Sequence, residues 1–168
     1  LCREVWKVTD ARVGVAATTR AQTDQEVDGQ DYFFVTEKQF EAQIAADEFL
    51  EYARVFDNYY GTPAGPVREM LDAGLTVILE IDIQGAAQVF AKMPEAIGVF
   101  VLPPSDEELR RRLGGRGRDD AATMAKRLAK AGYETATARK DGHCRHFVVN
   151  DDLAAAVGEM KRLIERKD

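Results

Sequence analysis

The sequence has 168 residues, of which 45% are hydrophobic and 31% charged, which is enough for one compact domain with its own core. Its 23 basic and 29 acidic residues give a formal net charge of −6, which argues against non-specific nucleic-acid binding. The two cysteines, Cys2 and Cys144, have no metal-binding spacing and are typical of a reducing cytosol. Because no apolar run approaches membrane-spanning length and no signal peptide is visible, we expect a cytoplasmic protein that binds neither membrane nor nucleic acid.

The first part of the chain predicts short strands and one capped helix. Thr36, with Gln39 at the third helical position, predicts a capping box, and Gly74 predicts the end of a later helix. In chain order, we expect a helix at 1–7, strands at 11–17 and 32–35, a helix from 36, strands at 50–56 and 58–62, and a helix at 66–73.

The second part of the chain alternates apolar runs with helical patterns. The run 76–81 is typical of a strand buried on both faces, and the order strand, helix, strand indicates a βαβ unit with a parallel sheet. Ser105 and Asp151 are the expected helix caps, with Glu108 completing a capping box at Ser105. The expected elements are strands at 76–81, 97–102 and 146–150 and helices at 84–93, 105–113, 121–138 and 151–165.

A first candidate site is Arg20, which follows a strand end and is flanked by Thr18 and Thr19, with Tyr32 further on. The guanidinium group matches a phosphate bidentately, and the hydroxyl groups could add donors. A solvated turn is the alternative.

A second candidate site joins Glu51 to the segment 58–62, which contains Tyr60 and Thr62. On neighbouring strands, these residues would form one wall with a carboxylate, a phenol and a hydroxyl. Guanine presents N1–H and N2–H₂ side by side, and a carboxylate accepts both. The alternative is a half-exposed strand with ordinary polar residues.

A third candidate site is formed by Glu80 and Asp82, which lie two residues apart where an apolar strand ends. They would point to the same face, toward the crevice where α/β proteins bind ligands. A polar cap at the strand end is the alternative.

A fourth candidate site is the arginine set Arg112, Arg116 and Arg127, the first two being separated by glycines. Phosphoryl transfer needs positive charge around the moving phosphate, and a hinged, cationic helix could supply it. The alternative is a solvated helix face. A loop cluster of His143, Cys144 and His146 is interpreted as incidental, so no metal ligand is assigned.

Together, these residues resemble the guanylate kinase family over nearly the whole chain. No single motif is decisive, but their joint occurrence in family order is specific. The matching motifs are Thr18-Thr19-Arg20, Glu26-Val-Asp-Gly29, Asp31-Tyr32, Phe49-Leu50-Glu51-Tyr52, Asn58-Tyr59-Tyr60-Gly61, Glu80-Ile-Asp82-Ile-Gln-Gly85, Pro103-Pro104-Ser105, Arg116-Gly117 and Val149-Asn150-Asp151-Asp152.

The resemblance implies an α/β fold, namely a parallel-sheet P-loop kinase core with an inserted mixed-β GMP-binding region and a helical lid. The core would comprise 1–14, 66–106 and 137–168, the GMP-binding region 15–65 and the lid 107–136. It implies phosphoryl transfer from ATP, bound with Mg²⁺, to GMP, in a monomer or homodimer.

The resemblance also implies a role for each candidate residue. The GMP phosphate would be held by Arg20, Tyr32 and Tyr60, and guanine would be recognised by Glu51, Thr62 and Glu80. Asp82 would lie beside magnesium, and Asn150 would lie near adenine. The phosphates would be contacted by three arginines, Arg112, Arg116 and Arg127.

The sequence departs from the family pattern in its ATP-binding segment and in its GMP-binding region. It contains no G-x-x-x-x-G-K-[ST] motif, and we expect such a segment to lie upstream of Leu1. Ala16 and Thr23 stand where the family usually has a phosphate-binding serine and a second phosphate-binding arginine, and Gln25 replaces a loop glycine. These departures leave two alternatives open: a non-catalytic module that binds GMP or a phosphorylated peptide, and a non-functional remnant.

Overall fold

The computed structural model describes residues 1–55, 57–114 and 121–165. By its internal contacts, the chain forms two compact units, one of Cys2–Ala96 and the other of Ile97–Asp168 with Leu1. The sheets contain both parallel and antiparallel strand pairs and are accompanied by helices, so the expected α/β fold is confirmed. The division into core, GMP-binding region and lid stays a prediction.

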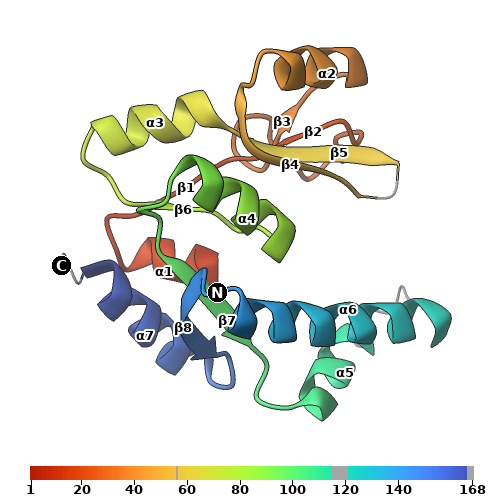
Figure 1. The fold of residues 1–168 in the computed structure, drawn as a ribbon, viewed down its shortest axis with the longest axis vertical. Helices are drawn as coiled ribbons and strands as arrows, with labels where there is room; N and C mark the ends of the chain where they lie inside the picture. The colour runs from red at the N-terminus through yellow and green to blue at the C-terminus, as the bar shows by residue number, and fades with distance from the viewer. Residues whose placement is uncertain (56, 115–120, 166–168) are drawn as a thin grey trace. The chain divides into compact units, whose positions relative to one another are not determined.

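The first unit contains two sheets and four helices among its described residues (Figure 1). Its elements are α1 (Cys2–Lys7), β1 (Arg12–Val13), β2 (Ala17–Thr18), β3 (Phe33–Phe34), α2 (Glu37–Ala45), β4 (Phe49–Val55), β5 (Asn58–Pro63), α3 (Ala64–Asp72), β6 (Val77–Ile78) and α4 (Ile83–Lys92). Strands β1 and β6 pair in parallel, whereas the other sheet is mixed, in the order β3-β2-β5-β4.

The mixed sheet lies between α2 and α4, as Figure 1 shows, and its two faces carry different clusters. Phe40 of α2 stacks on Phe49 of β4, with ring centroids 4.3 Å apart. The next residue of β4, Leu50, is fully buried on the opposite face, against Val89 of α4. This alternation is the two-residue period of a strand.

The second unit has a parallel pair of strands with three helices among its described residues (Figure 1). Its elements are β7 (Gly98–Leu102), α5 (Asp106–Gly114), α6 (Ala121–Lys140), β8 (Cys144–Val149) and α7 (Leu153–Glu165). Val148 of β8 and Ala156 of α7 are fully buried, and Arg139 of α6 lies over the Phe147 ring. None of the described helices has the length and apolarity needed to cross a membrane.

Two strand predictions were wrong in detail. The single strand expected at 11–17 is divided, because β1 pairs with β6 whereas β2 joins the mixed sheet. The run 76–81 forms hydrogen-bonded strand only at β6, where Val77 and Ile78 are half-buried and Glu80 beyond them is exposed. In the described part of the chain, β6 has one paired neighbour, and full burial of a strand needs cover on every side.

The cap predictions were partly wrong. The capping box of Thr36 and Gln39 is present in full. Ser105 Oγ accepts from the Glu108 backbone N–H, but the Glu108 side chain binds arginines instead of completing the box. The last helix is capped by Asp152, whose Oδ1 accepts from the Ala155 N–H at 2.8 Å, and not by the neighbouring Asp151.

Candidate active site

A β-bulge aims Glu51 away from the α2 side of the mixed sheet. Phe49 pairs with Pro63 and Glu51 pairs with Thr62, so two steps along β4 oppose one step along β5. The extra residue, Leu50, interrupts the alternation, and both Leu50 and Glu51 consequently face α4. Without the bulge, Glu51 would share the face of Phe49.

The carboxylate of Glu51 is buried, with 8% of the residue exposed, and Thr62 is 2% exposed. Thr62 Oγ1 donates to Glu51 Oε1 at 2.6 Å. Burial is the main cause that raises the pKa of Glu51, the hydrogen bond from Thr62 opposes it, and the nearby charge of Asp82 raises it further. The Glu51–Thr62 pair is therefore a desolvated acceptor whose chemistry suits a ligand with N–H donors.

Asp82 and Gly85 bring the start of α4 to this carboxylate. Asp82 is the N-cap of α4, and its Oδ1 accepts from the N–H groups of Gln84 and Gly85, both at 3.0 Å. A Cβ atom on Gly85 would lie 2.7 Å from Glu51 Oε2. Only glycine leaves room for the carboxylate at this approach.

Arg20, Tyr32 and Tyr60 lie together and form what we call the Arg20 cluster. The guanidinium carbon of Arg20 is 5.5 Å from the Tyr32 ring centroid, and the Tyr32 and Tyr60 rings meet edge to face at 6.1 Å. Hydrogen bonding to Glu26, with a smaller contribution from Tyr60, raises the pKa of Arg20. Tyr60 and Thr62 are two residues apart on β5, so the Arg20 cluster and the Glu51–Thr62 pair lie along one face of the sheet.

Glu26 engages the guanidinium fork of Arg20. Arg20 Nη1 donates to Glu26 Oε2 at 3.1 Å and Nη2 donates to Oε1 at 2.5 Å. Thr23 donates to the same Oε2 through its N–H and its hydroxyl. Hydrogen bonds from Arg20 and then from Thr23 lower the pKa of Glu26 to about 2. Sequence reasoning missed this pairing, although Glu26 stands within the motif that carried the resemblance.

The hydroxyl groups of Thr18 and Thr19 both bind the backbone of Tyr59, and the suggestion that they add donors to an anion site stays a prediction. Thr18 Oγ1 donates to the Tyr59 carbonyl at 2.9 Å, and Thr19 Oγ1 accepts from the Tyr59 N–H at 2.9 Å. Thr18 Oγ1 also accepts from the Arg20 N–H. These bonds fix the end of β2 against β5 and thereby place Arg20.

Glu80 is exposed and lies beside the Cys2 thiol of α1. Burial and the charge of Glu80, in that order, raise the pKa of Cys2. Glu80 is thus placed with α1, whereas the other predicted guanine-reading residues, Glu51 and Thr62, form a pair.

In the second unit, Arg112 joins α5 to the end of β8. Arg112 Nη1 donates to the Asn150 carbonyl at 2.7 Å, and Nε donates to Glu108 Oε1 at 2.6 Å. Arg111 and then Arg112 lower the pKa of Glu108 to about 2. Arg127 is an exposed residue of α6. Arg116 lies outside the described residues.

No group of three or more histidine, cysteine or acidic side chains in the described part of the chain could hold a metal ion. The interpretation of His143, Cys144 and His146 as an incidental cluster stays a prediction.

Comparison with known proteins gives one consistent result. The family model described as "Guanylate kinase" matches residues 6–167. The guanylate kinase of Sodalis glossinidius is 49% identical over 156 residues, which cover 92% of this chain and 73% of that protein. The guanylate kinase of Clostridioides difficile is 42% identical over 165 residues, covering 98% of this chain and 79% of that protein. A crystal structure of guanylate kinase from Anaplasma phagocytophilum superimposes with a TM-score of 0.78 at 29% identity, covering 96% of this chain and 77% of that one.

Proposed function

The chain belongs to the guanylate kinase family, and we propose that it transfers the γ-phosphoryl group of ATP to the 5′-phosphate of GMP. The observation that carries the proposal is the buried Glu51–Thr62 pair on the same sheet face as the Arg20 cluster. The pair accepts the N1–H and N2–H₂ donors of guanine, and the cluster binds the phosphate. GMP would therefore lie along β5.

The residues of the first unit bind and orient the acceptor. The Arg20 guanidinium group offers donors to the phosphate, and the Tyr32 and Tyr60 hydroxyls add donors at its sides. Glu80 is proposed as a further contact to guanine. An oxygen of the GMP phosphate then attacks the γ-phosphorus, the bond to the bridging β–γ oxygen breaks, and ADP and GDP form without a covalent enzyme intermediate.

Asp82 is the proposed residue facing magnesium. Its carboxylate is an oxygen donor, the ligand class that Mg²⁺ prefers, and α4 holds it in place through two backbone bonds. When bound with ATP, Mg²⁺ neutralises phosphate charge.

The residues proposed to act on ATP and on the transferring phosphoryl group belong to the second part of the chain. Arg112 and Arg127, together with Arg116, would stabilise the negative charge of the transferring phosphoryl group. Asn150, whose backbone carbonyl accepts a hydrogen bond from Arg112, would lie near adenine. We further propose a cytoplasmic protein that acts as a monomer or homodimer.

The alternative of a non-catalytic module for phosphorylated peptides is not favoured. The curated relatives named above are guanylate kinases, and a peptide ligand gives no reason for a desolvated carboxylate that accepts guanine donors.

The test is ADP formation from MgATP by the purified protein, with GMP compared with AMP and CMP. We expect GMP-dependent ADP release, and a loss of at least tenfold in kcat/KM for Glu51→Gln. Absence of GMP-dependent ADP release would overturn the kinase proposal. Binding of GMP by isothermal titration calorimetry would then show whether acceptor recognition survives.

A further inference from the structure

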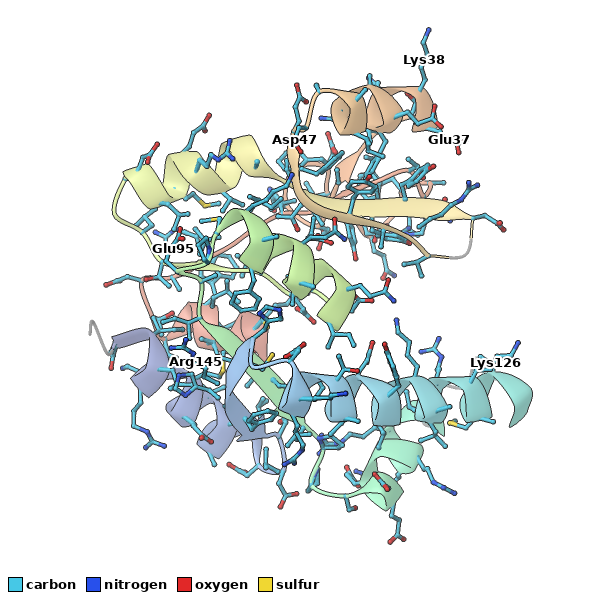
Figure 2. All side chains as sticks on the ribbon, in the orientation of Figure 1. Glu37, Lys38, Asp47, Glu95, Lys126 and Arg145 are labelled. Atoms are coloured by element: carbon cyan, nitrogen blue, oxygen red, sulfur yellow. The ribbon has the colours of Figure 1, made fainter. Side chains whose placement is uncertain are left out.

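Helix α4 is fastened to β4 by one stripe of residues, Gly85, Gln88 and Lys92. These positions are three and four residues apart, so they share a face of the helix. Lys92 Nζ donates to the Phe49 carbonyl and to Asp47 Oδ1, both at 2.6 Å, at the start of β4 (Asp47 is labelled in Figure 2). Gly85 lies against the Glu51 carboxylate.

Gln88, in the middle of the stripe, binds both backbone groups of Tyr52. The Tyr52 N–H donates to Gln88 Oε1 at 3.2 Å, and Gln88 Nε2 donates to the Tyr52 carbonyl at 3.0 Å. Strand β4 ends the order of the mixed sheet, so these two groups face its open edge. The carboxamide therefore takes the place that a further strand would occupy.

The hydrogen bonds between Gln88 and Tyr52 lie next to Glu51 in the chain and hold the backbone there. Tyr52 directly follows Glu51 and lies immediately after the bulge at Leu50. A bulge leaves the ladder locally disrupted, so its geometry needs other support. The carboxamide of Gln88 fixes the backbone on the C-terminal side of Glu51, and Gly85 limits where the carboxylate can go.

We propose that Gln88 is a positioning residue for guanine recognition, holding the bulged backbone so that the Glu51 carboxylate faces both N–H groups of the base. This inference rests on the proposed function, because it specifies how the same site achieves its selectivity. Gln88 touches neither substrate nor reacting atoms and acts through Glu51.

The experiment compares GMP with IMP, which lacks the 2-amino group and so offers the carboxylate one donor group fewer. For Gln88→Ala we expect GMP affinity to fall roughly tenfold and IMP affinity to fall much less, so that the selectivity ratio drops. Gln88→Glu keeps the acceptor for the Tyr52 N–H but loses the donor, and should retain an intermediate selectivity. Both affinities are measured by isothermal titration calorimetry.

Two controls separate positioning from general stability. Thr36→Ala removes the cap of α2, which packs on the other face of the mixed sheet, and should lower the melting temperature while leaving the GMP-to-IMP ratio unchanged. Gln84→Ala deletes an exposed carboxamide from α4 and should change neither quantity. Equal ratios in Gln88→Ala and the unmodified protein, or an equal loss of ratio in Thr36→Ala, would overturn the positioning role.

A measurement without ligand distinguishes failure of this inference from failure of the proposed function. Amide hydrogen exchange at Tyr52 should be slow in the unmodified protein and faster in Gln88→Ala. If the unmodified protein binds no GMP, the proposed function fails, and the positioning role fails with it whatever the exchange shows. If it binds GMP and Tyr52 exchanges equally fast in both proteins, only the inference about Gln88 fails.

Discussion

Arg20 and Glu26 form an ion pair whose formal charges cancel. Thr23 donates two further hydrogen bonds to Glu26 but adds no charge. In the proposed site, the phosphate of GMP would therefore meet an arginine that is shared with a carboxylate. The local positive charge is small for a site that must attract a dianion to a protein of net charge −6.

Thr23→Arg should strengthen GMP binding. An arginine at this position could pair with Glu26 and release the Arg20 fork, or bind the phosphate itself, and a charge-assisted contact of this kind is worth roughly tenfold in affinity. Titration calorimetry at fixed ionic strength measures the change. Gln25→Arg, at an exposed neighbouring position, makes the same change in net charge. An equal gain in that variant would show that general electrostatics, and not the contact at Glu26, is responsible.

Glu51→Gln should exchange function for stability. Because burial raises the pKa of Glu51, the folded protein holds this proton at a higher pH than the unfolded chain does, so stability falls as pH rises from the unfolded value of about 4.3 through the folded pKa. A neutral amide escapes this penalty. The variant should melt above the unmodified protein at pH 7, with a difference that shrinks toward pH 4, and should lose at least roughly tenfold in GMP affinity. A difference in melting temperature that grows on acidification would contradict the assignment.

At the scale of elements, the β4–β5 hairpin depends on close contact at Gly61. A Cβ atom there would lie 2.9 Å from the Glu51 carbonyl oxygen and 2.9 Å from Tyr52 Cβ, neither of which can move without the strand. Gly61→Ala should therefore lower the free energy of unfolding by about 1–3 kcal/mol, measured by urea denaturation.

The matched control for this substitution is Gly65→Ala in α3, where nothing lies within 4 Å of the added Cβ atom. This change should be neutral or stabilising by up to about 1 kcal/mol, because alanine favours the helix. If both variants lost equal stability, crowding at Gly61 would not be the reason.

Elements defined by neighbouring residues could be predicted from the sequence, whereas those defined by distant partners could not. The capping box of Thr36 and Gln39 needs only residues three apart, and it forms as predicted. The bulge at Leu50 depends on how β4 pairs with β5 and packs on α4, which no local pattern encodes. The division of 11–17 arises similarly, since β1 pairs with β6, far along the chain, whereas β2 pairs with β3 and β5.

The same contrast holds for the candidate site: its residues could be predicted from the sequence, but one of its contacts could not. Motif spacing was enough to select Glu51 with Thr62 and Arg20 with Tyr32 and Tyr60, because the family resemblance carried those positions. It could not show that Glu26 occupies the Arg20 fork, since that contact depends on how the intervening loop folds.

At the scale of the whole molecule, the described residues proposed to bind GMP all belong to the unit Cys2–Ala96. GMP at a hundred times its Kd should stabilise the folded state by about 2.7 kcal/mol. In hydrogen–deuterium exchange mass spectrometry, the new protection should concentrate in β2, β4, β5 and the start of α4. Protection confined to peptides from α5 to α7 would contradict the assignment of the acceptor site.

The carboxamide of Gln88 also covers backbone groups at the edge of the mixed sheet. A strand at the end of a sheet offers unpaired N–H and carbonyl groups to any other strand, and this is a common route to aggregation. Gln88 engages one such pair of groups on β4, next to the site that most needs its backbone undisturbed. Gln88 would therefore both support the backbone beside Glu51 and cover groups that could pair with another strand. A substitution that left nucleotide binding intact could still reduce the solubility of the protein at high concentration.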